Sequence, residues 1–210
     1  VGVNDSVPSR KGIPELLMAW SAYQPKNPLA RLHLHTSEVG NLPVGAHGGV
    51  RIDMLIKTLG IDPDSVKITE QYRYTTGVPA AELVRLAQAA DVLILPSRGE
   101  GFGLPLLEAQ RVGCPVITTN FAAQAELCFS GWLVEGEQEW SWQSAFQLKP
   151  GLLSIIEALD AAYQERDNPA RKQTAIERAS EYDVELVVAR HLAPTLRRIG
   201  EMALEMARVA

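Results

Sequence analysis

The sequence has 210 residues, a length that suits one or two ordinary domains with enough chain to bury a core. Hydrophobic residues make up 46% and charged residues 21%, which is typical of a soluble globular protein. The net charge of −5 argues against a general nucleic-acid binder, which would usually be basic, but allows a polyphosphate ligand held by a local basic site.

Cysteine content and hydropathy indicate the environment of the protein. The two cysteines, Cys114 and Cys128, favour a reducing compartment over a disulfide framework. No apolar run approaches the ~18 residues of a membrane span, and no signal peptide is visible. Since the chain begins at Val1 with what reads as the end of a strand, we expect a cytoplasmic fragment excised from a longer protein.

Strand and helix patterns alternate through residues 1–150. In chain order the pattern predicts a strand end (1–4), a polar turn (5–12), a helix (14–24), a strand (30–36), a glycine-rich loop (40–49), a helix (51–59), a strand (66–69), a polar loop (70–78), a helix (80–90), a strand (91–95), a glycine-rich turn and helix (96–113), a strand (115–119), a short turn or helix (122–128) and a last strand (132–135). Strands alternating with helices of ~10–15 residues predict an α/β domain whose parallel sheet is covered by helices on both faces.

After residue 150 the pattern changes to helices without strand signals, at 152–166, 170–182 and 184–208. Pro169 separates the first two of these segments. We therefore expect residues 151–210 to pack as helices on the same domain, without a core of their own.

The chain is organised around residues 96–117, in which a glycine-rich turn leads into a short helix. Pro105 fits the first helical turn, so we expect Leu104 to be the cap, and Gly113 followed by Pro115 ends the helix. A glycine-rich turn before a helix N-terminus is an anion site, because free N–H groups and the helix dipole both face the ligand.

Two glutamates, Glu100 and Glu108, lie in the turn and in the helix. Eight residues of helix rise roughly 12 Å. The two carboxyl groups of a glycosidase acid/base pair lie about 5 to 9.5 Å apart, which argues against such a pair. The glutamates could be simple surface residues, but the glycines on both sides of Glu100 favour a close ligand. They are placed to hold two ends of one elongated ligand with an anion bound between them.

Arg10 and Lys11 follow the first strand and are expected at the same edge of the sheet as the glycine-rich turn. Two cations facing a helix N-terminus suit a diphosphate, since arginine binds through a bidentate fork and lysine acts as a point charge. The alternative is a solvated turn.

Other candidate sites are weaker. His33 and His35 lie on one face of a strand, but no Cys or carboxylate cluster joins them, so the sequence predicts no metal site. The Gly101-x-Gly103 pair does not follow the first strand and lacks the third glycine of a dinucleotide fingerprint, so NAD binding is weakly supported. Trp140 and Trp142 are expected to serve packing.

The segment Glu100-Gly-Phe-Gly-Leu-Pro-Leu-Leu-Glu108, with Pro96-Ser97 before it and Gly113-Cys114-Pro115 after it, resembles the E-x7-E region of retaining GT-B glycosyltransferases of family 4. Arg10-Lys11-Gly12 resembles the basic loop of their C-terminal, donor-binding domain, and Ala125-Glu126-Leu127 also resembles the family. The likeness covers roughly residues 1–150 and implies a Rossmann-like domain that is one half of a GT-B fold.

The resemblance implies roles for these residues in binding a UDP- or GDP-hexose donor. Glu100 would bind the sugar hydroxyls and Glu108 the ribose, while Arg10 and Lys11 would bind the diphosphate, with Glu100 and Lys11 in the catalytic set. The backbone N–H groups that would meet the sugar and diphosphate are those of Gly101, Phe102, Gly103 and Leu104. The base would lie near residues 72–78, and neither a metal ion nor another cofactor is implied.

The sequence departs from the family pattern in two loops. The Gly-Arg common near the end of the first strand is replaced at residues 3–5 by Val-Asn-Asp, and the Gly-Gly pair common before Ala125 reads Ala122-Ala123-Gln124. The resemblance implies that the N-terminal domain, which would supply acceptor recognition and any peripheral membrane contact, lies outside this sequence. The alternatives are a non-catalytic nucleotide-sugar-binding domain and a nucleotide-sugar epimerase or hydrolase of the same architecture.

Overall fold

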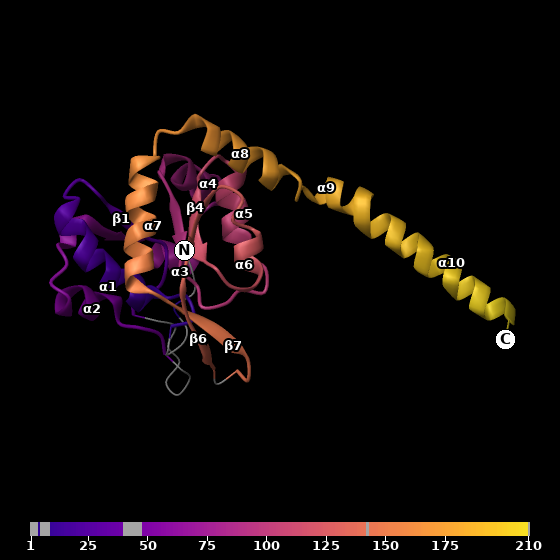
Figure 1. Ribbon diagram of the computed structural model, residues 1–210, viewed down its shortest axis with the longest axis horizontal. Helices are drawn as coiled ribbons and strands as arrows, with labels where there is room; N and C mark the ends of the chain where they lie inside the picture. The colour runs from indigo at the N-terminus through magenta and orange to yellow at the C-terminus, as the bar shows by residue number, and fades with distance from the viewer. Residues whose placement is uncertain (1–3, 5–8, 40–47, 142, 210) are drawn as a thin grey trace.

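The computed structural model describes residue 4 and residues 9–39, 48–141 and 143–209. Figure 1 shows a body of strands enclosed by helices, from which a long C-terminal helix projects. The predicted strand end at residues 1–3 and most of the glycine-rich loop, residues 40–47, lie outside the described part of the chain.

The strands form parallel sheets and one antiparallel hairpin. They are β1 (Leu32–Leu34), β2 (Val66–Ile68), β3 (Leu93–Leu95), β4 (Val116–Thr119), β5 (Gly131–Val134), β6 (Gly136–Trp140) and β7 (Phe146–Pro150). β1 pairs with β2, and β4 lies between β3 and β5, all in parallel, whereas β6 and β7 pair antiparallel. The parallel strands confirm the predicted α/β class.

The helices lie on both sides of these strands (Figure 1). They are α1 (Ile13–Tyr23), α2 (Ile52–Thr58), α3 (Gln71–Thr76), α4 (Ala80–Ala89), α5 (Leu104–Arg111), α6 (Ala122–Glu126), α7 (Leu152–Gln164), α8 (Pro169–Ser180), α9 (Val184–Val187) and α10 (Ala193–Val209), with 3₁₀ turns η1 (Gln24–Lys26) and η2 (Pro63–Ser65) and the π-helical turn η3 (Val188–Leu192). α1 packs against α7, and α5 packs against α8.

The central strand β4 is covered on both faces, which explains why its apolar residues do not alternate with polar ones. Val116 packs into a cluster with Leu106 of α5, while the next residue, Ile117, packs into the cluster formed by α1 and α7. Successive side chains of a strand point to opposite faces, so a strand covered on both faces must be apolar at every position. The two clusters on either side of β4 are the core of the domain.

Two local expectations were wrong. Residues 71–76 form α3 instead of a loop, because the carboxylate of Glu70 accepts hydrogen bonds from the N–H groups of Tyr72 and Arg73 (both 2.9 Å) and caps a helix in a polar stretch. The N-cap of α5 is Gly103 rather than Leu104, since Gly103 has φ +104° and Leu104 is already helical.

The hairpin of β6 and β7 was not predicted. Its first strand, Gly-Glu-Gln-Glu-Trp, carries neither the apolar alternation nor the β-branched residues that indicate a strand. Contacts with residues distant in sequence hold it instead: the N–H of Leu148 donates to the carbonyl of Arg98 (2.9 Å), and the N–H of Gly151 donates to the carbonyl of Glu135 (2.9 Å).

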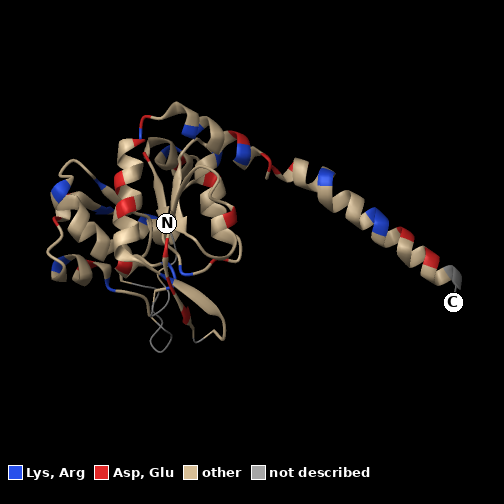
Figure 2. Cartoon of the chain, in the orientation of Figure 1, with Lys and Arg blue, Asp and Glu red and all other residues tan. Residues whose placement is uncertain are grey.

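Of residues 151–210, all expected to pack on the same domain, α7 packs against α1 and α8 packs against α5, but α9 and α10 follow a different course. These last helices run away from the body (Figure 1), and large apolar side chains of α10 such as Leu196 and Met206 are more than half exposed. Lys, Arg, Asp and Glu are interspersed along this segment (Figure 2). The π-helical turn precedes Pro194, whose missing N–H removes one helical hydrogen bond. Among the described residues, no helix combines the length and hydrophobicity that a bilayer crossing requires.

Candidate functional site

A tight turn brings the basic residues of the first loop against the end of β3. Gly12, the N-cap of α1, has φ +65°, a conformation that L side chains rarely adopt. A Cβ atom at this position would lie 2.1 Å from the carbonyl oxygen of Pro96. Only glycine allows this approach, which sets Arg10 and Lys11 at the carboxyl edge of the parallel strands.

The main chain of this turn is joined to the glycine-rich loop. The carbonyl oxygen of Arg10 accepts a hydrogen bond from the N–H of Arg98 (2.8 Å) and another from the Ser97 hydroxyl (3.0 Å). The guanidinium of Arg10 donates to the carbonyl of Gly99 (3.1 Å). The two loops are therefore held together, although their residues are almost ninety positions apart.

Glu100 is the centre of this contact. One of its carboxylate oxygens accepts from Arg10 (3.2 Å), and the other forms an ion pair with the ammonium group of Lys11. The side chains of Glu100 and Lys11 are only 11% and 12% exposed. Burial acts to raise the pKa of Glu100, but the Lys11 hydrogen bond and the charges of Lys11 and Arg10 together hold it below its ordinary value. The carboxylate is thus charged at neutral pH.

Gln124, which the sequence analysis did not select, sets the shape of the loop. Its side chain is fully buried, and its amide oxygen accepts from the N–H of Glu100 (2.8 Å). Its amide nitrogen donates to the carbonyl of Ser97 (2.9 Å) and to the Thr119 hydroxyl (2.6 Å). It ties the start of α6 to the loop, but nothing in the sequence indicated that a glutamine here would be buried.

Arg98 was also missed. Its guanidinium forms a buried ion pair with Glu15 of α1 (2.6 Å) and a second with Glu139 of β6. The Arg98 and Glu15 side chains are 6% and 5% exposed. This network connects α1, the glycine-rich loop and the hairpin, and it fixes the part of the loop that leads to Glu100.

The glycine-rich loop leads into the N-terminus of α5 as predicted. No side chain caps this helix. Gly101 lies exposed, and a Cβ atom built on it meets no atom within 4 Å, so the space beside it is open. Phe102 and Leu104 are also exposed, whereas Gly103 is buried. An anion can therefore approach the first N–H groups of the helix.

Glu108 lies apart from Glu100. It is exposed on α5, and within the described part of the chain its carboxylate has no hydrogen-bond or ion-pair partner. The structure thus gives the two glutamates different surroundings, one held by two cations and the other open to solvent.

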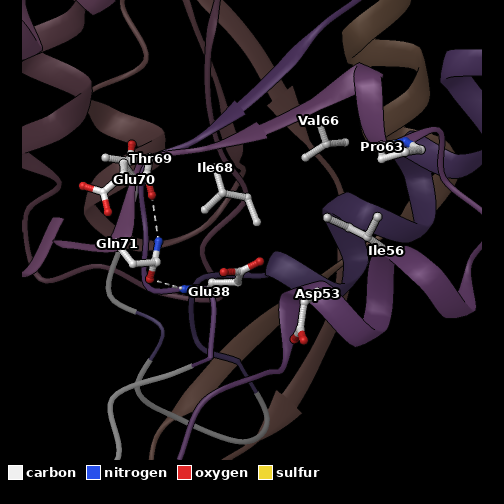
Figure 3. A pocket seen from close by; sticks show the side chains of 9 residues that line it. All are labelled: Glu38, Asp53, Ile56, Pro63, Val66, Ile68, Thr69, Glu70 and Gln71. Carbon is white, nitrogen blue, oxygen red and sulfur yellow. Dashed lines mark hydrogen bonds between the residues drawn. The ribbon is translucent and has the colours of Figure 1, made fainter. Parts of the chain in front are cut away.

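A pocket of about 410 Å³ lies along β2, from Pro63 before the strand to Gln71 after it, next to the segment expected near the base (Figure 3). Its lining comes from α2, β2 and the adjoining loops: Glu38, Asp53, Ile56, Pro63, Val66, Ile68, Thr69, Glu70 and Gln71. The Gln71 amide donates to the carbonyls of Thr69 (2.7 Å) and Thr36 (3.3 Å) and accepts from the N–H of Glu38 (2.9 Å). The pocket has an apolar wall and a polar rim, which suits a flat heterocycle.

The two histidines of β1 and its following loop do not form a metal site in the described structure. A ring nitrogen of His33 and one of His35 each lie 3.0 Å from the hydroxyl oxygen of Thr69. Burial lowers the pKa of both imidazoles, aided by Lys67 for His33. No group of three or more His, Cys, Asp and Glu side chains is placed to hold a metal ion among the residues described.

Two loops differ from the family pattern in ways that the structure explains. Asn4 is buried, donating to the carbonyls of Ser37 (2.9 Å) and Val50 (2.7 Å) and accepting from the N–H of Val50 (2.7 Å), so it braces a loop. Ala122 has φ +51°, which shows that the alanine keeps a left-handed backbone that favours glycine.

The two cysteines have thiols of low reactivity. Burial raises the pKa of both Cys114 and Cys128 to about 11, so neither thiol is a thiolate at neutral pH.

Comparison with known proteins decides the family. Residues 4–147 match the family model described as glycosyl transferases group 1. The chain belongs to this family. The matched region of this chain contains the Arg10–Lys11 turn and the Glu100 loop.

A D-inositol 3-phosphate glycosyltransferase from Corynebacterium urealyticum is 42% identical over 86 residues, which are 39% of this chain and 20% of that protein. The lipopolysaccharide-biosynthesis glycosyltransferase WaaG has a TM-score of 0.61 at 19% identity, covering 87% of this chain and 42% of that one. The C-terminal domain of a group 1 glycosyl transferase, LpcC from Francisella tularensis, has a TM-score of 0.56 at 20% identity, covering 87% of this chain and 80% of that one. The chain thus spans about a fifth of the curated relative and under half of WaaG.

Proposed function

We propose that this chain is the donor-binding part of a retaining glycosyltransferase of family 4, which transfers a hexosyl group from a UDP- or GDP-sugar to an acceptor. The family membership supports the transferase reaction. The fold likeness to the separate C-terminal domain of LpcC supports the assignment to the donor half. Most of the acceptor site would then belong to a domain outside this chain.

The observation that carries the proposal is the convergence of Arg10 and Lys11 on Glu100 beside the uncapped N-terminus of α5. A diphosphate is complementary to two cations and a row of free N–H groups. In the donor complex the diphosphate would replace Glu100 as the partner of the two cations. The released carboxylate would then accept hydrogen bonds from the sugar hydroxyls.

The remaining groups fit around this centre. Glu108, exposed on α5, would accept from the ribose hydroxyls, and the base would enter the pocket beside Thr69 and Gln71. Lys11 and the N-terminus of α5 would stabilise the negative charge that develops on the leaving diphosphate. The acceptor would attack from the same face as the departing diphosphate, which retains the configuration of the sugar without a protein nucleophile or a metal ion.

Two other functions remain as alternatives: a non-catalytic nucleotide-sugar-binding domain, and an epimerase or hydrolase of the same architecture. Turnover by the complete protein that is lost on Glu100→Ala would exclude the first. Analysis of the products formed without acceptor would reveal the second. For the isolated 210-residue chain we expect donor binding without transfer, and for the complete protein a cytoplasmic location.

Isothermal titration calorimetry of the 210-residue chain with UDP, GDP and their hexoses, in EDTA, tests the proposal. We expect binding to one nucleotide series, and a loss of about tenfold or more on Lys11→Ala, since a hydrogen bond to a charged group contributes about 1.5–3 kcal/mol. Arg197→Ala removes a cation from the projecting helix α10 and is the matched control. A folded chain that binds none of these nucleotides would overturn the proposal.

A further inference from the structure

The hairpin of β6 and β7 is attached to the candidate donor site at two points. The carbonyl of Arg98, two residues before Glu100, accepts from the N–H of Leu148 (2.9 Å), and the Arg98 guanidinium contacts Glu139 of β6. At its base the hairpin also touches the basic turn, because a Cβ atom on Gly12 would lie 3.4 Å from Cγ of Pro150. The position of the hairpin relative to Arg10, Lys11 and Glu100 is therefore set by direct contacts.

One face of the hairpin changes from buried to exposed along its length. Trp140 pairs with Phe146, Gln138 with Leu148 and Gly136 with Pro150, so these side chains share a face. Leu148 and Pro150 are buried near the turn at Gly12, whereas Trp140 is 63% and Phe146 58% exposed. Phe146 lies four residues from Pro150, which places the aromatic pair roughly 13 Å along the strand from the basic turn. Figure 1 shows the hairpin projecting from the body beyond the parallel strands.

The two rings pack against each other. They meet edge to face, with centroids 5.0 Å apart and planes at 82°. Beyond them the hairpin is closed by two bonds between Ser141 and Ala145, in which the N–H and the hydroxyl of Ser141 each donate to the Ala145 carbonyl (2.9 Å). Packing between the rings accounts for the stability of the pair, but it leaves more than half of each ring in contact with water.

The chemistry of this face suits a sugar ring. The C–H bonds on one side of a pyranose carry partial positive charge and pack on the negative face of an aromatic ring, while its hydroxyls need polar partners. Gln138 offers an exposed amide on the same face. A protein partner fits less well, because stable interfaces bury about 800 Å² on each side, and two aromatic side chains supply about 150–250 Å² each at most.

We propose that Trp140 and Phe146 form a platform that binds a saccharide ring of the acceptor; this inference rests on the proposed transfer function. The donor diphosphate would occupy Arg10 and Lys11, and the transferred sugar Glu100, so the platform remains for the group that receives the sugar. Trp140 and Phe146 are then specificity-determining residues, and Arg98 positions them relative to the donor.

The test follows the indole N–H signal of Trp140 in the ¹⁵N-labelled 210-residue chain, assigned with Trp140→Phe. The probes are methyl α-D-glucopyranoside, methyl α-D-mannopyranoside and maltose. We expect one of them to shift this signal. In calorimetric titrations with the same saccharide, Trp140→Ala and Phe146→Ala should weaken the binding about tenfold. Trp140→Phe should restore most of the affinity. Leu153→Ala, which removes an apolar side chain that is 75% exposed on α7, should leave it unchanged.

UDP and GDP titrations of the same samples separate this inference from the proposed function. If the chain binds saccharide at Trp140 but binds no nucleotide, the donor-binding assignment is wrong and the saccharide platform is supported. The platform would be overturned if the chain binds nucleotide but none of the three saccharides shifts the Trp140 signal. It would also be overturned if Trp140→Ala leaves the affinity for the saccharide unchanged. In the complete enzyme, Trp140→Ala should raise the KM for the acceptor about tenfold and leave the KM for the donor unchanged. Protection of the Trp140 indole by another domain in the absence of acceptor would also refute the platform.

Discussion

Replacing Arg98 by methionine should destabilise the domain more than any surface charge change, and the structure explains by how much. Arg98 and Glu15 lie 2.6 Å apart with side chains 6% and 5% exposed, so removing the arginine leaves a carboxylate buried without its counter-charge. Within the described structure Oε2 of Glu15 already has no hydrogen-bond partner. Breaking a buried pair in this way costs about 3–5 kcal/mol. Since 1 kcal/mol moves the Tm of a domain of this size by about 2–4 °C, we expect Tm to fall by about 10 °C.

Urea unfolding followed by tryptophan fluorescence measures this change, because Trp20 is buried in the core. The free energy of unfolding of the double variant R98M/E15L should exceed that of R98M by at least about 2 kcal/mol. Two apolar side chains can pack together at this buried site, whereas R98M leaves the Glu15 carboxylate there without a counter-charge. Glu139→Gln should cost less than about 1 kcal/mol, because the Glu139 side chain is 39% exposed and water can solvate the Arg98 nitrogen that it leaves. A loss below 1 kcal/mol for R98M, or no recovery in the double variant, would refute the reasoning.

Three further predictions concern the site. Glu108→Ala should weaken UDP or GDP binding about tenfold in calorimetry, with an unchanged Tm because Glu108 is exposed; equal affinity would remove the ribose role. Glu100→Gln should destabilise the chain at about pH 7, because the Lys11 ion pair lowers the folded-state pKa of Glu100. This difference should disappear as the pH falls through that lowered pKa. Thermal unfolding across this range measures it, and a difference that grows on acidification would contradict the sign. Ala122→Gly should raise stability by about 0.5 kcal/mol, since it relieves the left-handed backbone at a small cost in chain entropy; a lower Tm would show that this conformation carries no strain.

The loops that form the site were predictable where one local pattern has one structural meaning. The glycines from Gly99 to Gly103, followed by Pro105, indicate a turn before a helix N-terminus whatever the rest of the chain does. The sequence predicts that the basic turn and this loop each follow a strand, and parallel strands bring their carboxyl ends to one edge, so their proximity could be inferred before any coordinates. The apolar strands and the amphipathic α1 also follow directly from periodicity.

Other features depend on partners far away in sequence. Arg98 and Gln124 read as ordinary polar residues, and only the folded chain shows that one is buried between α1 and β6 and the other against the main chain of Glu100. The sequence of β6 is not strand-like. This strand forms because its pairing with β7 and the ion pair between Glu139 and Arg98 stabilise it. Burial of a polar side chain is a property of what surrounds it, and periodicity carries no information about that.

In the C-terminal segment, the sequence predicted the helix but not whether the helix packs on the domain. An amphipathic pattern correctly predicted the helix of α10, because helical periodicity is local. Whether such a helix lies on its own domain depends on an apolar surface there to receive it, and α1, α7 and α8 already cover the core. The sequence by itself determined the α/β class, the glycine-rich turn before the N-terminus of α5 and the basic turn that faces it. The tertiary structure alone decided the ion pairs of Glu100, the support from Arg98 and Gln124, and which helices pack, because each of these requires two distant segments to meet.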